Sequence, residues 1–213
     1  MRREKPERED AGDGIFVRLN HLRARANLMR EPARQPLPGS VLLPDMGVVI
    51  ARSGSFFASL SGGDGRGAFS HRDAGDLSLY YEGRPVLIDC GLPGADAHSV
   101  PSIEGVEQTG ARRAPEPPEL RRDGYFLLTM DIAHAYPPAA RLSAWQRSLI
   151  LTPGEDAVRL IDAFDFEGTA RRATVRFITP HEPKFADGGA LLGPLLMRFP
   201  PGLIPSVEPI PLG

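Results

Sequence analysis

The sequence predicts an all-β protein: an antiparallel, supersandwich-like β-sandwich preceded by one short helix. Two observations carry this prediction. Glycine (23) and proline (22) are spread along the 213 residues and divide them into many short segments. Several segments alternate apolar and polar residues with the period of two that a half-buried strand requires. A composition of 41% hydrophobic and 24% charged residues is ordinary for a globular protein, and the chain is long enough for a sizeable core.

The first 40 residues differ in character from the rest. Residues 1–14 are mostly polar and are predicted to form a disordered tail. Residues 15–40 are predicted to contain a helix, with Asp13 as its N-cap, and then a proline-rich linker. Four apolar residues recur in the helix at three- and four-residue spacing: Ile15, Leu19, Leu22 and Ala26. We expect a short docking helix with a solvated arginine-rich face, and a membrane-surface helix is the alternative.

Residues 41–213 are predicted to form the sandwich domain, truncated at its C-terminus and without an α/α toroid. Its first hairpin joins Val48–Ala51 to Phe56–Leu60 through a turn at Ser53-Gly54. Residues 76–91 contain a second hairpin, in which alternating apolar and polar residues precede a turn at Glu82-Gly83. Later strands are predicted at Tyr125–Ala133, Trp145–Leu151, Val158–Phe166 and Ala173–Thr179.

Charge and composition exclude several classes of protein. The formal net charge of −2 leaves no basic footprint, so no nucleic-acid partner is expected. No segment approaches the roughly 18 apolar residues of a membrane span, so no membrane partner is expected either. The only cysteine, Cys90, excludes an internal disulfide. The charged N-terminus has no apolar run behind it and is not a signal peptide, which leaves a cytoplasmic location open.

Two of the five histidines lie where chemistry is plausible. His71 precedes the hairpin in residues 76–91, and Asp89 ends its second strand. Because a hairpin brings its two ends together, His71 and Asp89 can be neighbours, and His98 can fold back over the same end. Two imidazoles and one carboxylate are a common set of zinc ligands, completed by a water or a fourth ligand. The alternative is a hydrogen-bonded His–Asp pair at a strand end.

Other polar and aromatic side chains in these segments have structural explanations. Asp73 and Asp76 are expected to be solvated loop carboxylates or turn caps. No Gly-x-Ser-x-Gly sequence occurs, so a serine nucleophile has no support. Three aromatic residues on predicted strands are expected in the core, with a sugar-stacking platform as the alternative: Trp145, Phe164 and Phe177.

Several ordered motifs resemble one family. The first is FSHRDAGDLSLYYEGRPVLIDCG (69–91), which is similar to the signature of heparinase II/III-like polysaccharide lyases, including alginate-oligomer lyases. In that family a His-x-His-x-Asp-x-Gly run precedes a strand, and a Gly-Arg-Pro turn and a strand ending in Asp-x-Gly follow. Residues 98–108 resemble its His-Asn-x-Pro-x-Ile-Asn-Gly-x-x-Gln segment, and residues 131–151 its Asp-Ile-x-x-Ala-Tyr-Pro and Arg-bearing strands. The resemblance covers roughly residues 15–210.

The resemblance implies an architecture and an activity. Family members pair a helical α/α toroid with a C-terminal antiparallel β-sandwich, and they cleave uronate-containing polysaccharides by β-elimination. Their sandwich holds a structural zinc through a His, an Asp and a His, which correspond to His71, Asp89 and His98. Arg72 and Gln108 are the expected substrate-binding residues, with an acidic polysaccharide or oligosaccharide as the ligand. A separate helical toroid domain is a further expected partner, and the family resemblance favours the periplasm.

Four departures from the family pattern concern catalysis by this chain alone and the geometry of the third metal ligand. The first histidine of the family's His-x-His transfers a proton, and its position is Phe69 here. A tyrosine and another histidine come from the toroid, which we expect this chain to lack. The segment between Asp89 and His98 is shorter than usual, and Ser99 stands where the family has Asn. The chain is therefore interpreted as a fragment or the product of a decayed gene, with no catalytic residue assigned.

Two functions follow as expectations. The first is a lyase-family domain that is inactive in isolation. The alternative is a non-catalytic, zinc-stabilised sandwich that binds acidic glycans or a partner chain. A cupin-like metal barrel is disfavoured, because the paired metal histidines of cupins are missing. This alternative would draw its carboxylate contacts from five arginines, for which scattered surface charge is the favoured interpretation: Arg66, Arg72, Arg84, Arg112 and Arg113.

Overall fold

The predicted all-β fold is confirmed. The computed structural model describes residues 38–62, 71–92, 94–109, 119–169, 171–186 and 188–210, which belong to one compact unit, Pro38–Gly213. Within these ranges the regular structure is antiparallel strands and three short 3₁₀ helices. The predicted tail and N-terminal helix lie outside the described residues. No helix in the described part of the chain is long and apolar enough to cross a bilayer.

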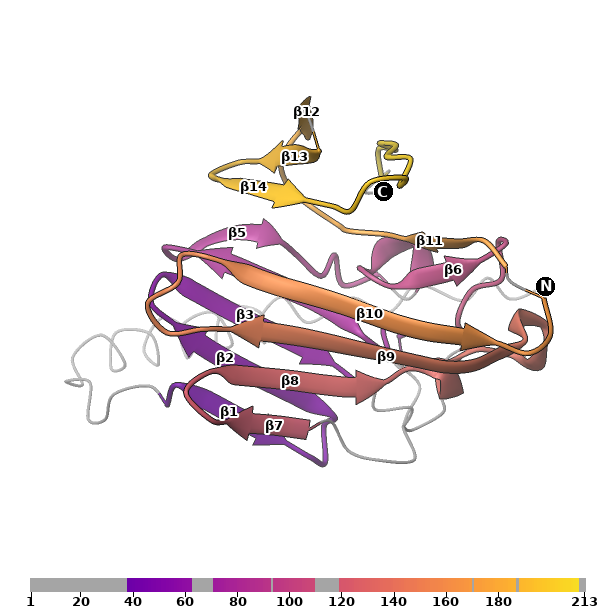
Figure 1. The fold of residues 1–213 in the computed structure, drawn as a ribbon, viewed down its shortest axis with the longest axis horizontal. Helices are drawn as coiled ribbons and strands as arrows, with labels where there is room; N and C mark the ends of the chain where they lie inside the picture. Colours follow the sequence, from indigo (N-terminus) through magenta and orange to yellow (C-terminus); the bar gives the residue numbers. More distant parts are fainter. Residues whose placement is uncertain are drawn as a thin grey trace, which may run out of the picture. The chain divides into compact units, whose positions relative to one another are not determined.

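A five-stranded antiparallel sheet begins the domain, and its strands follow chain order (Figure 1). Its second hairpin turns at Glu82 and Gly83, as predicted. Both residues have positive φ (49° and 74°), so the turn matches the twist of the two strands that it joins. The first hairpin turns at Gly54 and Ser55, one residue later than predicted. The strands are β1 (Ser40–Leu43), β2 (Val48–Ser53), β3 (Phe56–Ser61), β4 (Asp76–Tyr81) and β5 (Arg84–Leu87).

A four-stranded antiparallel sheet forms the second layer, in the order β10-β9-β8-β7. Figure 1 shows it in front of the first sheet. The two longest strands, β9 and β10, are joined through a loop that contains Pro153-Gly154 and pair along most of their length. The strands are β7 (Glu119–Arg122), β8 (Phe126–Asp131), β9 (Leu142–Leu151) and β10 (Val158–Phe166).

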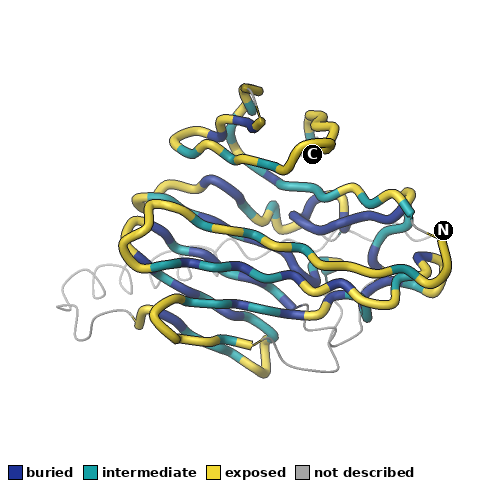
Figure 2. The backbone as a smooth tube through the Cα atoms, in the orientation of Figure 1, coloured by how far each residue is buried: buried dark blue, intermediate teal, exposed yellow. Residues whose placement is uncertain are grey.

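The hydrophobic core fills the space between these two sheets. Along β2, β3 and β9 buried residues alternate with more exposed ones, which gives the banded pattern in Figure 2. This alternation follows from the strand period of two, because every second side chain faces the opposite sheet. Side chains with no exposed surface come from both layers: Val49, Ala51, Ala58, Leu60, Leu128, Trp145 and Leu149.

The edge strand β10 explains one wrong expectation. Trp145 is fully buried, as predicted, but Phe164 keeps 46% of its surface exposed. The two rings stack with centroids 4.5 Å apart and 19° between their planes. Phe164 pairs with Trp145 across the β9–β10 ladder, so both side chains face the same side of the sheet. Because β10 ends the sheet, no further strand of that sheet covers the outer side of the Phe164 ring.

Two small sheets and three 3₁₀ helices complete the described structure. A three-stranded sheet contributes Ala190 and Leu192 to the core, whereas its cross-strand pair Leu191 and Leu196 is 40% and 45% exposed. The small sheets are β6 (Pro101–Ile103) with β11 (Ala173–Val175), and β12 (Lys184–Ala186) with β13 (Gly189–Leu192) and β14 (Leu195–Arg198). The 3₁₀ helices are η1 (Ala95–Ala97), η2 (Ala133–Ala135) and η3 (Pro138–Ala140).

Side-chain truncation should lower stability much more on the inner face of the second sheet than on its outer face. Leu149→Ala removes a fully buried side chain and leaves a cavity, so we expect a loss of about 2–5 kcal/mol in the free energy of unfolding. The control is Ile161→Ala on β10, whose side chain is 44% exposed on the outer face. Urea denaturation monitored by Trp145 fluorescence measures both variants. Equal losses in the two variants would contradict the assignment of inner and outer faces.

Candidate metal centre

Three segments bring His71, Asp89 and His98 to one end of the sandwich. His71 lies five residues before β4, and Asp89 lies two residues after β5. Because β4 and β5 form a hairpin, their outer ends return to the same place. His98 follows directly after η1, and its ring contacts the Leu92 carbonyl. The juxtaposition that the hairpin and the loop predicted is therefore present in the structure.

The possible ligand atoms of these three residues all lie within 4.8 Å of one another. The His98 Nδ1 atom is 3.3 Å from the Asp89 Oδ1 atom. The two imidazole rings lie with centroids 5.4 Å apart and planes inclined by 43°. A tetrahedral zinc with bonds of about 2.0 Å places its ligand atoms about 3.3 Å apart. The His98–Asp89 separation meets this requirement, and the third ligand has to move by no more than about 1.5 Å.

The orientation of His98 favours metal ligation by its Nδ1 atom. The side chain has no exposed surface, and its Nε2–H donates to the Leu92 carbonyl at 2.7 Å. In a neutral imidazole this bond places the proton on Nε2 and the free lone pair on Nδ1. The buried Nδ1 atom has no hydrogen-bond partner, although the Asp89 carboxylate is nearby. A backbone carbonyl that fixes the tautomer is the usual support of a metal-binding histidine.

Carboxylates surround His98 and attract positive charge to it. Burial alone would lower the pKa of His98, but Asp76, Asp89 and Asp73 outweigh burial and raise the pKa above its ordinary value. The site therefore favours a cation, whether a proton or a metal ion. The three candidate ligands differ in exposure: His98 is buried, His71 is half-buried and the Asp89 side chain is 42% exposed.

Asp76 is a part of this centre that the sequence interpretation missed. The sequence predicts a solvated loop carboxylate or a turn cap at this position, but Asp76 is buried. Its Oδ1 atom accepts a hydrogen bond of 2.5 Å from the Ser99 backbone N–H, and its Oδ2 atom is 3.9 Å from His98 Nδ1. Asp76 thus ties the start of β4 to the residue that follows His98. Its proximity to Ser99 depends on a contact between residues 23 positions apart, which local sequence patterns do not reveal.

The two predicted substrate contacts lie in different environments. Arg72 is exposed beside His71. Gln108 is 1% exposed, and its amide both donates to the Ala74 carbonyl (2.7 Å) and accepts from the Ala74 N–H (3.0 Å). Gln108 also donates to the hydroxyl of Tyr136, at 3.4 Å. In this structure Gln108 therefore anchors the segment that follows His71, and substrate binding by Arg72 and Gln108 remains a prediction.

Tyr136 accepts a hydrogen bond from Gln108 and so also helps to anchor the segment that follows His71. Burial raises the pKa of its phenol well above the ordinary value, so the hydroxyl stays protonated and donates to the Pro101 carbonyl. Gln108, Tyr136 and Pro101 lie in the part of the chain that carries the family-like motifs, residues 98–151.

The sequence motifs, the sandwich and the histidine cluster agree with one comparison. The sequence model described as "Heparinase II/III-like, C-terminal" matches residues 35–190, most of the chain. The chain belongs to the heparinase II/III-like family. No curated protein matches the chain. The heparinase II/III-like match includes His71, Asp89, His98 and both large sheets, so the candidate metal centre lies within the family domain.

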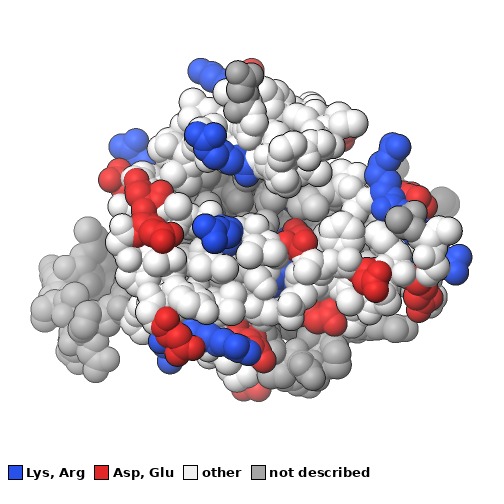
Figure 3. All heavy atoms as spheres, viewed as in Figure 1, with Lys and Arg blue, Asp and Glu red and all other residues white. Residues whose placement is uncertain are grey.

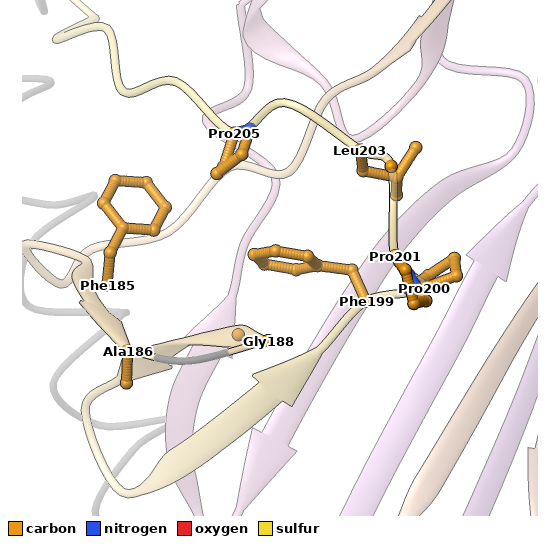
Figure 4. A pocket seen from close by; sticks show the side chains of 10 residues that line it. Phe185, Ala186, Gly188, Phe199, Pro200, Pro201, Leu203 and Pro205 are labelled. Carbon is orange, nitrogen blue, oxygen red and sulfur yellow. The ribbon is translucent and has the colours of Figure 1, made fainter.

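A separate apolar pocket lies outside the candidate metal centre, beside the three-stranded sheet. Its volume is about 390 Å³. Figure 4 shows the rings of Phe185 and Phe199 on its walls, with Leu203 and Pro205 on the segment that follows β14. None of its lining residues has a charged or titratable side chain, so this pocket of the heparinase II/III-like domain cannot carry acid–base chemistry.

Replacing Gln108 should destabilise the segment that follows His71. In Gln108→Leu the buried N–H and carbonyl of Ala74 lose their partner, and each unsatisfied group costs about 1–3 kcal/mol. We therefore expect a clear loss in the free energy of unfolding, measured by urea denaturation. Gln146→Leu on the exposed face of β9 is the matched control and should change little. A Gln108→Leu variant as stable as the wild type would contradict the anchoring role.

Proposed function

We propose that this heparinase II/III-like domain binds one structural zinc ion through His71, Asp89 and His98. The observation that carries the proposal is the buried His98 Nδ1 atom, which lacks a hydrogen-bond partner and lies 3.3 Å from Asp89. Histidine nitrogens and a carboxylate form a donor set that suits zinc. A bound zinc would cross-link three chain segments and so stabilise the folded state. The three ligands themselves lie outside the strands and the 3₁₀ helices, between β3 and β4, after β5 and after η1.

The purified chain should bind zinc in a ratio of one to one, measured by metal analysis and by competition with a chromophoric chelator. His98→Ala should lose binding, whereas His181→Ala should keep it, because His181 contacts the Pro85 carbonyl away from the cluster. Free zinc at 100 times its Kd should add about 2.7 kcal/mol to the free energy of unfolding of the wild type. Equal zinc binding by His98→Ala and the wild type would refute the proposed ligand set.

We further propose that the domain derives from a polysaccharide lyase that acts on uronate-containing glycans and that this chain alone does not turn them over. β-Elimination requires neutralisation of the uronate carboxylate, a base that removes the C5 proton and an acid that protonates the departing glycosidic oxygen. Family resemblance assigns one of these proton transfers to the position of Phe69, whose side chain cannot exchange a proton. It assigns the other transfers to a helical domain, outside the matched residues 35–190.

The activity proposal is tested on alginate, heparin and hyaluronan. We expect no increase in absorbance at the band of the unsaturated uronate product with the wild-type chain, because loss of a general acid or base typically costs a factor of about 10²–10⁴ in rate. Phe69→His is the matched variant and shows whether restoring the histidine is sufficient. Clear turnover by the wild type would contradict the proposal.

A second candidate function is binding of acidic glycans without turnover. The exposed guanidinium of Arg72, next to the candidate metal ligand His71, supports it, because arginine pairs with carboxylates through two parallel hydrogen bonds. The face of the molecule in Figure 3 carries acidic and basic side chains interspersed, without one dominant basic field. A glycan on this face would therefore be recognised by local pairs rather than by bulk charge. Binding of alginate by the purified chain, measured by affinity electrophoresis, together with no product in the absorbance assay, would favour this second function.

A further inference from the structure

Arg147 is a charged residue in an apolar position. It lies on the inner face of β9, between Trp145 and Leu149, and like them it has no exposed surface. A buried guanidinium is costly unless its donors are satisfied and its charge is balanced. The structure meets both conditions, with contacts in two directions from the one side chain.

On one side, Asp162 balances the charge. It pairs directly with Arg147 across the β9–β10 ladder. Arg147 donates from Nε to Asp162 Oδ1 at 2.8 Å and from Nη2 to Asp162 Oδ2 at 2.9 Å, a two-bond contact of fixed geometry. Trp145 Nε1 also donates to Asp162 Oδ1, at 2.9 Å. We call Arg147 and Asp162 the inner-face ion pair. Asp162 thereby fixes where the remaining guanidinium nitrogen points.

On the other side, the remaining nitrogen, Nη1, binds the two segments that contain His71 and His98. Arg147 Nη1 donates to the Gly75 carbonyl at 2.8 Å and to the Ser99 carbonyl at 2.6 Å. Gly75 lies four residues after His71, and Ser99 follows His98 directly. One guanidinium nitrogen therefore connects the chain near His71 to the chain beside His98. These two segments meet again at Asp76, which accepts the Ser99 N–H.

The packing around Gly75 is tight, so the hydrogen bond from Arg147 fixes the position of the chain there. Gly75 has a φ of 86°, and a Cβ atom there would lie 3.0 Å from Ile132 Cγ2 and 3.6 Å from Arg147 Cδ. Its own N–H donates to the Ser61 carbonyl, at 2.6 Å. The segment after His71 is thus held from several sides and has little freedom to move away from Arg147.

We propose that Arg147, oriented by Asp162, is a positioning residue that sets the separation of His71 and His98 for metal binding. This inference rests on the proposed zinc site. The second sheet contributes no ligand, but through Arg147 it controls the geometry of the metal centre. The fork shape of the guanidinium is essential, because a lysine ammonium in its place cannot bridge the carboxylate and both carbonyls with planar geometry. Residues that orient metal ligands typically change affinity by a factor of about 10–100 when replaced.

The experiment compares Arg147→Lys and Arg147→Met with Leu149→Ala in the full chain. Leu149 is two residues further along the same face of β9 and equally buried. Its aliphatic side chain cannot form hydrogen bonds to the ligand segments. Zinc affinity is measured by chelator competition at a temperature where every variant is folded, and bound Co²⁺ reports ligand geometry through its visible spectrum. Amide hydrogen exchange of the zinc-free proteins reports the order of residues 71–76 and 98–103 independently of metal.

We expect both Arg147 variants to bind zinc about 10–100-fold more weakly, to shift the Co²⁺ spectrum and to exchange faster at the two segments. Leu149→Ala should lower stability but keep zinc affinity within about twofold, since the ligand geometry is intact. Unchanged affinity and unchanged exchange in the Arg147 variants overturn the inference while leaving the zinc site standing. An equal loss of affinity in Leu149→Ala also overturns it. If the wild type binds no zinc, the zinc proposal fails, and faster exchange in the Arg147 variants still supports the positioning of the two segments.

Discussion

The inner-face ion pair is the interaction on which the geometry of the candidate metal centre depends. Removing the two charges from water costs several kcal/mol for each ion. Five hydrogen bonds that involve Arg147 or Asp162 offset this cost, each worth about 1.5–3 kcal/mol because a charged group takes part. Cost and gain are therefore of similar size. The pair adds little net stability, and its main effect is to permit only one arrangement of the segments that it joins.

That arrangement explains why loops with little regular structure can build a defined centre. The two sheets are conventional, with a core of alternating inward side chains. The segments with His71 and His98 have few ladder hydrogen bonds of their own, so their positions depend on side chains that reach them from elsewhere. Gln108 holds Ala74, and Arg147 holds Gly75 and Ser99. Each bond uses a backbone group of the loop, so it restrains the path of the chain whatever side chain the loop carries.

Local patterns predicted the parts of this domain that are determined locally. The Glu82-Gly83 turn fixed a hairpin, and the hairpin alone placed His71 near Asp89. The burial of Asp76 was not predictable in this way, because its partner Ser99 lies across a loop. The short strands β12 to β14 were not predicted as a separate sheet, since three or four residues carry too little periodicity.

The inner-face ion pair itself left a signal in the sequence that was overlooked. Arg147 occupies an apolar position in the alternation of Trp145, Leu149 and Leu151, and Asp162 occupies one in the alternation of β10. Opposite charges at inward positions of two adjacent predicted strands indicate a buried pair. The register that makes them direct neighbours pairs Leu151 with Val158 across the connecting loop, and the Pro153-Gly154 turn alone does not specify it.

The three candidate ligands are unequally exposed, so the centre has a buried side and a solvent side. His98 is sealed by the core, whereas Asp89 opens to water. The Asp89 carboxylate therefore marks the side of the cluster from which an ion would approach, and the buried His98 imidazole marks the side that faces the core.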